Sequence, residues 1–295
     1  MEINEATVHK IPELRNPDLI FALAGWSDAA EVATGTVLYL ARSLNAIGFA
    51  NIEGSEFYNF SIVRPEITID RGLITSLQLP HNSLFYWKNQ KTDHDLVLFH
   101  GIEPHFNWQK FVDTILDLAS MLKVRRVYAL GGLYGSTPHT KEPRISGLVN
   151  RPGLLAVLQK HSIEPINYQG PSSLHSLLLT NCAQRNIEAI SLWGHAPFYV
   201  RVETNPLVCL GLAKKLTELL EIEIDLEELK KAGEHLQNML NRFLADSKEL
   251  QLYIQKLEER YELEGITPAE QLEGADRIVK EVEDFLRKQR RREAT

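Results

Sequence analysis

Short apolar runs and stretches of helical periodicity alternate along the sequence as far as residue 220. The first apolar run, residues 18–26, reads DLIFALAGW and is typical of a buried strand. Residues 29–46 follow it and place Val37, Leu40 and Leu44 on one side of a helix. This alternation predicts an α/β fold with a mainly parallel central sheet that helices cover on both faces.

The other expected elements continue this alternation. Residues 66–70 and 73–79 alternate apolar and polar side chains around a glycine, which favours antiparallel strands or a hairpin, and residues 56–63 have a similar pattern. The further strands expected are SLFYWKN (83–89), DLVLFHG (95–101), VRRVYALGG (124–132) and IEAISLWG (187–194). The further helices expected are 107–121, one that begins near Pro152, 172–185 and 206–220.

Strand-like patterns disappear after residue 224, so we expect an α/β domain, 1–224, and a helical extension, 225–295. Apolar residues of the extension recur mostly every three or four positions, although Ser247 occupies one of the core positions. This seam predicts a hairpin of two long helices, broken at EGITPAEQ (264–271), where Thr267 caps the second helix. Such a hairpin packs either on the α/β domain or on another subunit.

The composition argues against several classes of function. A net charge of −7 and a pI of about 5.8 disfavour nucleic-acid binding, which requires a basic surface. The basic run RKQRRR (287–292) suits the negative end of a last helix. No apolar run approaches the roughly 20 residues of a membrane span, and the polar N-terminus is unlike a signal peptide. Because Cys182 and Cys209 both lie in apolar helical stretches, we expect free thiols in a cytoplasmic protein.

The stretch GWSDAAEVATG (25–35) lies where a strand ends and a helix begins, a common position for phosphate-binding loops. Asp28 and Glu31 fit an acidic capping box, and two carboxylates at this helix end repel a phosphate. Neither G-x-G-x-x-G nor a Walker lysine is present. We therefore expect a capped helix start, with Trp26 exposed in the loop to contact a ligand or a protein partner.

The stretch HGIEPHFNW (100–108) also follows an expected strand. His100, Glu103 and His105 have the side chains of metal ligands, but a loop that contains proline does not hold all three on one side, so no metal site is expected. Glu103 is better placed to hydrogen-bond a ligand or a neighbouring backbone at the carboxyl edge of the sheet. Trp108 is a further candidate for binding a ligand or a partner.

The stretch GGLYGSTPHTKEPRISG (131–147) contains the strongest site candidate. Gly131 and Gly132 allow close backbone approach, and His139 and Arg144 can bind an anion. A polar loop of this length often carries function. A solvated structural loop is the alternative.

The stretch GHAPFY (194–199) ends another expected strand and adds His195 and Tyr199 to the candidates. His195 is expected at the same sheet edge as the other loops, as a binding residue or as a hydrogen-bonded loop histidine. The sequence has no G-x-S-x-G nucleophile elbow, so a serine hydrolase has no support.

Six stretches, taken in order, resemble the PAC2 family, which is named after a proteasome assembly chaperone. They are GWSDAAE (25–31), RPEITID (64–70), GIEPHFNW (101–108), GGLYGSTPHTKEPRISG (131–147), YQGPSS (168–173) and SLWGHAPFYV (191–200). The trailing segments LEELKKAGE and LYIQKLEE are similar to the C-terminal part of the longer bacterial members.

The resemblance implies a nucleoside-phosphorylase-like α/β fold and a tendency to form homo- or hetero-oligomers. Eukaryotic and archaeal members help to assemble or cap the proteasome core, some of them through a C-terminal hydrophobic-Tyr-x tail. This sequence ends in RRREAT and departs from that tail, which argues against docking to a proteasome in this way. Other relatives are described as ATP-dependent carboxylate-amine ligases, but no nucleotide-binding motif supports that activity here.

We therefore expect a self-associating, assembly-chaperone-like protein that binds another protein and uses no cofactor. The alternative is an enzyme, either an ATP-dependent carboxylate-amine ligase or a nucleoside phosphorylase or hydrolase, that acts on a small anionic substrate. In an enzyme, six candidates would line one cleft: Trp26, Asp28, Glu103, Arg144, His195 and Tyr199. A single concave pocket with perturbed pKa values would favour the enzyme. A large exposed apolar patch would favour the binding protein.

Overall fold

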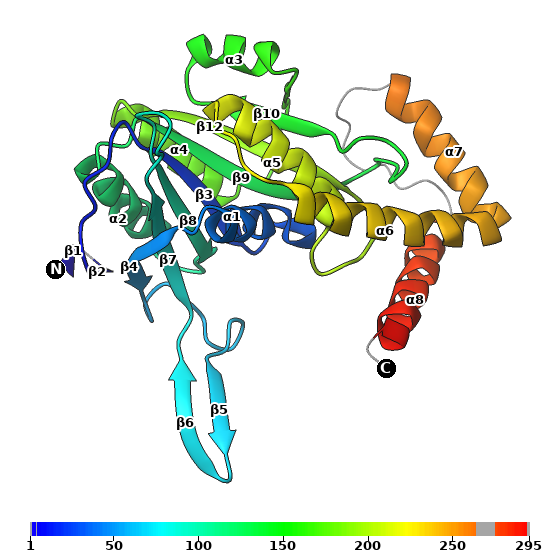
Figure 1. The fold of residues 1–295 in the computed structure, drawn as a ribbon, viewed down its shortest axis with the longest axis horizontal. Coiled ribbons are helices and arrows are strands. Elements are labelled where there is room, and N and C mark those ends of the chain that lie inside the picture. The colour runs from blue at the N-terminus through cyan, green and yellow to red at the C-terminus, as the bar shows by residue number, and fades with distance from the viewer. Residues whose placement is uncertain (1, 4, 264–274, 294–295) are drawn as a thin grey trace.

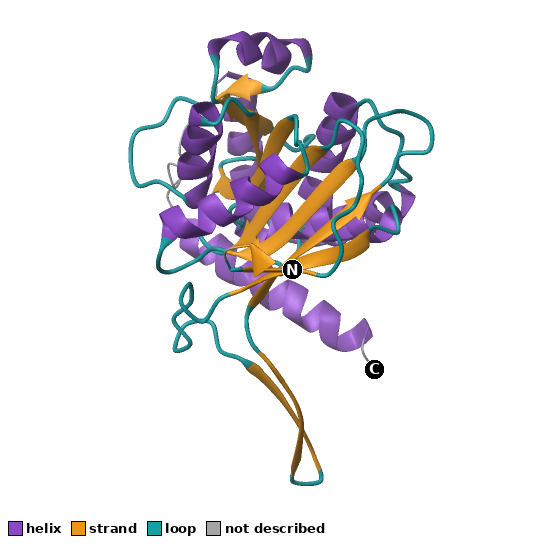
Figure 2. Ribbon diagram, turned by 90° about the vertical axis from the view of Figure 1, so that its left-hand side faces the viewer, coloured by secondary structure: helices purple, strands orange, loops and turns teal. Residues whose placement is uncertain are grey.

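The computed structural model describes residues 2–3, 5–263 and 275–293, and it has a central sheet between layers of helices (Figures 1 and 2). The strands of this sheet have the order β1-β2-β4-β7-β8-β3-β9-β12-β10-β11. Their bounds are β1 (Glu2–Ile3), β2 (Ala6–Val8), β3 (Asp18–Ala24), β4 (Ile47–Glu53), β7 (His81–Trp87), β8 (Leu96–Ile102), β9 (Arg126–Gly135), β10 (Ile145–Val149), β11 (Glu164–Pro165) and β12 (Glu188–Pro197).

The sheet is mixed, which corrects the expectation of a mainly parallel one. The adjacent strands β8, β3, β9 and β12 run parallel in its centre. On either side of them, β7 is antiparallel to β8 and β10 is antiparallel to β12. Only a short turn joins β7 to β8, and a parallel pair needs a crossover of a dozen or more residues, so these two strands pair antiparallel.

Helices cover both faces of the sheet, as the sequence predicts. α1 (Val32–Ser43) and α5 (Pro206–Leu220) lie on one face, and α2 (Trp108–Met121) and α4 (Leu174–Gln184) lie on the other. The central strand β3 contributes to both cores: Phe21 packs with α2 and α4, and Ile20 packs with α1 and α5. Two further short elements, a 3-10 turn (Pro152–Leu154) and α3 (Leu155–Lys160), precede β11.

The described part of the C-terminal extension forms three helices instead of the predicted hairpin of two. They are α6 (Glu227–Asp246), α7 (Lys248–Leu263) and α8 (Ala275–Glu293). The backbone at Ser247 is extended, with φ −125° and ψ 102°, and its hydroxyl accepts a hydrogen bond from the Leu250 nitrogen at 3.3 Å. Ser247 therefore starts a new helix where the apolar pattern alone predicts continuity. The predicted break and the Thr267 cap lie outside the described residues.

The helical extension packs on the α/β body, which is one of the two arrangements the seam allows. Residues 198–200, at the end of β12, share a buried apolar cluster with side chains of all three helices. Phe198 and Tyr199 each pack edge-on against Tyr253 of α7, with ring centroids 6.0 and 6.4 Å apart. The rings anchor α7 to the sheet because each buries a large apolar area.

A separate two-stranded hairpin projects from the body next to β7 (Figures 1 and 2). It consists of β5 (Glu66–Asp70) and β6 (Leu73–Gln78), as the alternating pattern predicts. Arg71 and Gly72 form its two-residue turn with φ of 48° and 84°, the left-handed conformations that match the twist of a hairpin. Residues 56–63, predicted as a further strand, are turn and loop, and we call β5 and β6 the arm below.

Candidate functional site

The loop between β3 and α1 is held by the buried carboxylate of Asp28. This carboxylate accepts hydrogen bonds from the backbone nitrogens of Ala33 at 2.7 Å and Thr34 at 3.3 Å, and from the Thr34 hydroxyl. Burial raises the pKa of Asp28, and nearby Glu31 adds to the rise, whereas these hydrogen bonds oppose it. Asp28 thus binds the helix terminus from inside the protein and does not face a ligand.

The start of α1 differs from the predicted capping box. Ala30 and Glu31 both have left-handed backbones, with φ of 52° and 45°, so the helix begins at Val32. The side chain of Glu31 accepts a hydrogen bond from the Thr204 hydroxyl and does not return to the Asp28 backbone. The loop is therefore a turn before the helix, in which the sequence pattern placed the first helical turn itself.

Gly131 and Gly132 lie in β9 and allow two close approaches. The Gly132 nitrogen donates to the Ser27 oxygen at 2.7 Å, and a Cβ on Gly132 would lie 2.9 Å from the Ala29 oxygen. A Cβ on Gly131 would lie 2.6 Å from the ring of Trp193. The paired glycines therefore admit a neighbouring loop and a tryptophan of the same chain.

Glu103 and Trp108 hydrogen-bond neighbouring backbone at the carboxyl edge of the sheet. One Glu103 oxygen accepts from the Leu174 nitrogen at 2.9 Å, so this carboxylate binds the N-terminus of α4. The indole nitrogen of Trp108 donates to the Pro104 oxygen at 2.6 Å. Both side chains stabilise the turns after β8.

His139 and Tyr199 form a buried pair beneath the C-terminal helices. The Tyr199 oxygen lies 2.7 Å from both the backbone nitrogen and the Nδ1 atom of His139. Burial lowers the pKa of His139 to about 4, although Asn241 and Glu258 oppose the change. The histidine is neutral at pH 7, so it does not attract an anion by charge.

Arg144 joins the same loop to α7. Its guanidinium donates to the Tyr261 oxygen at 3.0 Å and stacks 4.5 Å from the centre of that ring. In the opposite direction, the Tyr261 hydroxyl donates to the Glu142 oxygen at 2.9 Å. The polar loop of residues 136–144 therefore lies between the α/β body and the helical extension.

His195 lies at the end of β12, and its Nε2 atom is 2.7 Å from the Ser146 hydroxyl. Burial lowers the pKa of His195 to about 4, and the Arg144 charge lowers it further. His139 and His195 border a cavity of about 10 Å³, which has room for about one water molecule. Small-molecule sites usually have volumes of about 300–1,000 Å³.

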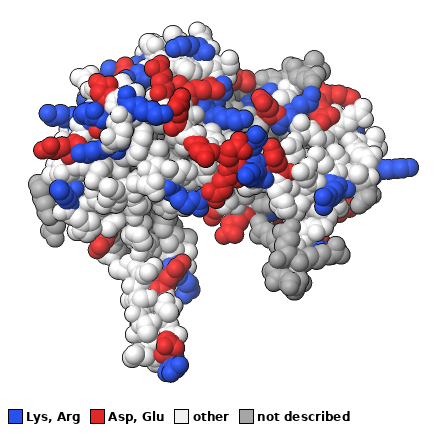
Figure 3. Space-filling view, in the orientation of Figure 1, with Lys and Arg blue, Asp and Glu red and all other residues white. Residues whose placement is uncertain are grey.

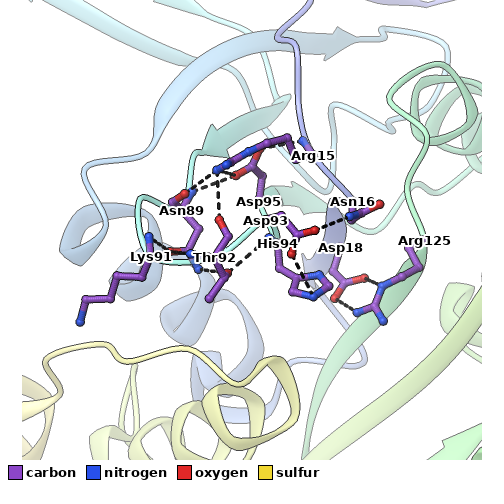
Figure 4. A network of polar contacts seen from close by, with 10 residues as sticks. All are labelled: Arg15, Asn16, Asp18, Asn89, Lys91, Thr92, Asp93, His94, Asp95 and Arg125. Carbon is purple, nitrogen blue, oxygen red and sulfur yellow. Dashed lines mark hydrogen bonds and ion pairs between the residues drawn. The ribbon is translucent and has the colours of Figure 1, made fainter.

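A second group of polar side chains lies at the opposite, amino edge of the parallel strands (Figure 4). Arg125 donates two hydrogen bonds to Asp18, at 3.2 and 2.7 Å, and Arg15 lies 3.2 Å from buried Asp95. Burial raises the pKa of Asp18, and Arg125 opposes the rise. Ligands of open α/β sheets bind at the carboxyl edge, so this network serves to pair buried charges.

The candidates thus occupy separate environments and do not line one cleft. Asp28 is beneath α1, Glu103 is at the start of α4, and the remaining polar candidates are covered by the C-terminal helices. Within the described ranges, no three histidine, cysteine or acidic side chains converge as a metal site. Two larger hollows, one at the base of the arm and one beside Arg15, lie away from these candidates.

Exposed aromatic side chains lie at the carboxyl edge of the sheet. Trp26 follows β3, Phe106 follows β8 and Tyr168 precedes α4, and each is more than half exposed. The three loops are adjacent because Glu103 contacts both Gly25 and the Leu174 nitrogen. Residue-type reasoning singled out only Trp26, although the other two aromatics lie in the stretches GIEPHFNW and YQGPSS.

These features define an α/β protein with a mixed sheet, a projecting arm and a helical extension docked on its carboxyl edge. The sequence profile of the PAC2 family matches residues 22–244, and the chain belongs to this family. None of the helices in the described part is long and apolar enough to cross a membrane. Among curated protein sequences, none matches this one.

Solved structures of bacterial and archaeal proteins share the fold. A PAC2 family protein from Streptomyces avermitilis is 32% identical with a TM-score of 0.74, over 80% of this chain and 99% of that one. A proteasome-assembly chaperone homologue from Mycobacterium tuberculosis is 28% identical, with the same TM-score and coverage. An archaeal proteasome activator from Pyrococcus furiosus is 21% identical, with a TM-score of 0.66 over 82% of this chain and 99% of that one.

Proposed function

We propose that this chain is a self-associating, assembly-chaperone-like protein of the cytoplasm that works by binding another protein. The observation that carries the proposal is the exposure of Trp26, Phe106 and Tyr168 on adjacent loops at one edge of the sheet. Large aromatic side chains are enriched at the centres of protein interfaces, where they contribute much of the binding energy. Both cysteines are buried and free, which suits a reducing compartment.

The polar candidates support protein binding better than catalysis. Asp28, Glu103 and His195 use their polar atoms on partners within the chain, and the adjoining cavity is far smaller than a substrate site. The relative from Mycobacterium tuberculosis is named as a homologue of a proteasome-assembly chaperone, which is a protein-binding role. An interface built on exposed loops needs no enclosed pocket.

The aromatic edge can be tested by capturing partners from cells that express the tagged full chain. The variant carries Trp26→Ser and Tyr168→Ser, and the control carries Leu252→Ser, which removes an equally exposed apolar side chain from α7. We expect the first variant to lose the captured protein and the control to retain it. Equal capture by both variants would contradict the assignment of the interface to this edge.

A thermal-shift screen against nucleotides and nucleosides tests the enzyme alternative on the unmodified protein. A specific ligand at 100 times its Kd adds roughly 2.7 kcal/mol to the stability. We expect no such shift. A saturable shift with one nucleotide, together with no captured protein, would overturn the proposed function.

A further inference from the structure

The arm has one apolar face that nothing in the described structure covers. Ile67 is paired with Leu77, and Ile69 with Ile74, so these side chains lie on one face of the hairpin, and Leu79 extends it. All five are at least half exposed. The paired residues Thr68 and Ser76 lie on the other face. Figure 3 shows that most of the arm's surface is uncharged.

A two-stranded hairpin of this kind needs a partner surface. β5 and β6 pair only with each other, whereas the other described strands join the central sheet. An isolated hairpin is marginally stable in water, and it becomes stable when an apolar face packs against another layer. Exposed contiguous apolar patches also mark interaction sites on otherwise polar proteins. The arm is therefore built to be covered.

The charges of the arm favour a second copy of this chain as the cover. Residues 64–79 contain Arg64, Glu66, Asp70 and Arg71 and carry no net charge, while the whole chain has a net charge of −7. Two arms can therefore approach without the repulsion that opposes contacts between the acidic bodies. If the arms lie antiparallel with their apolar faces together, the tip of each reaches the base of the other.

The base of the arm offers a groove for that tip. The groove has a volume of about 530 Å³ and is lined by Leu77 and Leu79 of the apolar face and by Glu53. The nearby acids Glu5 and Glu56 are both bridged by Lys110. Within the described ranges Glu53 forms no ion pair, so the groove keeps one carboxylate available to a cation.

The tip carries the complementary charge. Arg71 lies in the hairpin turn, at the far end from the groove, and it forms no ion pair with any described residue. In the antiparallel arrangement, Arg71 of each copy lies beside Glu53 of the other. The contact occurs twice by symmetry, because both copies use the same surface.

We propose that two copies of this chain associate through their arms, which pack antiparallel with the apolar faces in contact and each tip in the groove at the partner's base. The inference rests on the self-association in the proposed function and names the surface that performs it. An interface built from two hairpins is at the small end of stable interfaces. We therefore expect a dissociation constant in the micromolar range.

The first test compares two neighbouring residues on opposite faces of β5. Ile69→Asp places a carboxylate in the proposed contact, and Thr68→Asp places the same carboxylate on the polar face. Sedimentation equilibrium of the full chain from about 1 to about 200 μM gives the dissociation constant. We expect Ile69→Asp to raise it at least about 100-fold, because two charges would be buried without partners. Thr68→Asp should leave it within about threefold of the original value.

The second test addresses the orientation of the arms. Arg71→Glu and Glu53→Arg each place like charges together twice and should weaken the dimer by about tenfold. The double variant restores opposite charges and should recover most of the affinity. A parallel arrangement predicts no such recovery, because the two positions would then be far apart.

The outcomes separate this inference from the proposed function. A stable oligomer that Ile69→Asp leaves intact would overturn the role of the arm and leave self-association standing. A protein that is monomeric up to about 200 μM would overturn both. Loss of the dimer in Thr68→Asp as well would show that the arm acts only through its folding, and circular dichroism of the three proteins checks that directly.

Discussion

The hydroxyl oxygen of Tyr199 lies 2.7 Å from the backbone nitrogen of His139, 60 positions away in the sequence. Both side chains are buried, and Tyr199 also packs against Tyr253 of α7. One hydroxyl thus ties the loop after β9 to the end of β12, beneath the helical extension. The bond matters because a buried backbone donor without a partner is costly.

Tyr199→Phe removes this acceptor and keeps the ring. We expect the free energy of unfolding to fall by about 1–3 kcal/mol, because the His139 nitrogen is left without its partner in the interior. Urea unfolding followed by circular dichroism measures the change. The matched control is Tyr168→Phe, which removes an exposed hydroxyl and should change the stability by less than about 0.5 kcal/mol. Equal effects of the two substitutions would contradict the assigned role of the bond.

The buried histidines predict a loss of stability in mild acid. Burial lowers the pKa of His139, His175 and His195 to about 4, whereas an unfolded histidine titrates near 6.5. Between these pH values the unfolded chain binds more protons than the folded one, so stability falls as the pH falls from about 6.5 toward 4. The loss per histidine is on the order of 3 kcal/mol.

His195→Gln isolates one of these contributions. Between pH 7 and 4.5 the variant should lose about 2–3 kcal/mol less stability than the original protein. The comparison is needed because the raised pKa values of Asp18 and Asp28 act in the opposite direction, adding stability as the pH falls. Urea unfolding across this range measures both slopes, and identical slopes would show that His195 is not buried in its neutral form.

The close approach at Gly132 predicts a steric cost. A Cβ there would lie 2.9 Å from the Ala29 oxygen and from the Cβ of Val32, so Gly132→Ala forces the 25–31 loop away from β9. We expect a loss of about 1–3 kcal/mol in thermal or urea unfolding. At Gly153 a Cβ has nothing within 4 Å, so Gly153→Ala should be neutral or slightly stabilising. A neutral Gly132→Ala would mean that the loop does not pack this closely.

The secondary structure as far as residue 220 could largely be predicted because local patterns decide it. β3 is apolar on both faces since Ile20 and Phe21 belong to different cores, and this is what a run of apolar residues encodes. The same pattern could not reveal that β7 and β10 run antiparallel to the central strands. Strand direction depends on the connections and on the neighbours that each strand meets.

The contacts of the candidate residues were less predictable because they depend on distant parts of the chain. Asp28 was expected to cap α1, but two left-handed residues, Ala30 and Glu31, shift the start of the helix without any glycine to signal it. Nothing near Arg144 indicates that Tyr261 covers it. The arm was expected as strands, but alternation alone does not tell whether strands join the main sheet.

The contact of Arg144 with Tyr261 predicts that one side chain controls the docking of α7. The guanidinium both donates to the Tyr261 oxygen and stacks on its ring. Removing it in Arg144→Ala loses a charge-assisted hydrogen bond and a cation–π contact. Hydrogen exchange should show protection in α7 reduced by about tenfold, which corresponds to about 1.4 kcal/mol. Protection in β3 should stay unchanged, because the core packing around that strand is separate. Lys256→Ala removes an exposed cation from the same helix and should leave α7 unaffected. If both variants loosen β3 as much as α7, the extension and the body unfold as one unit and this contact does not control docking.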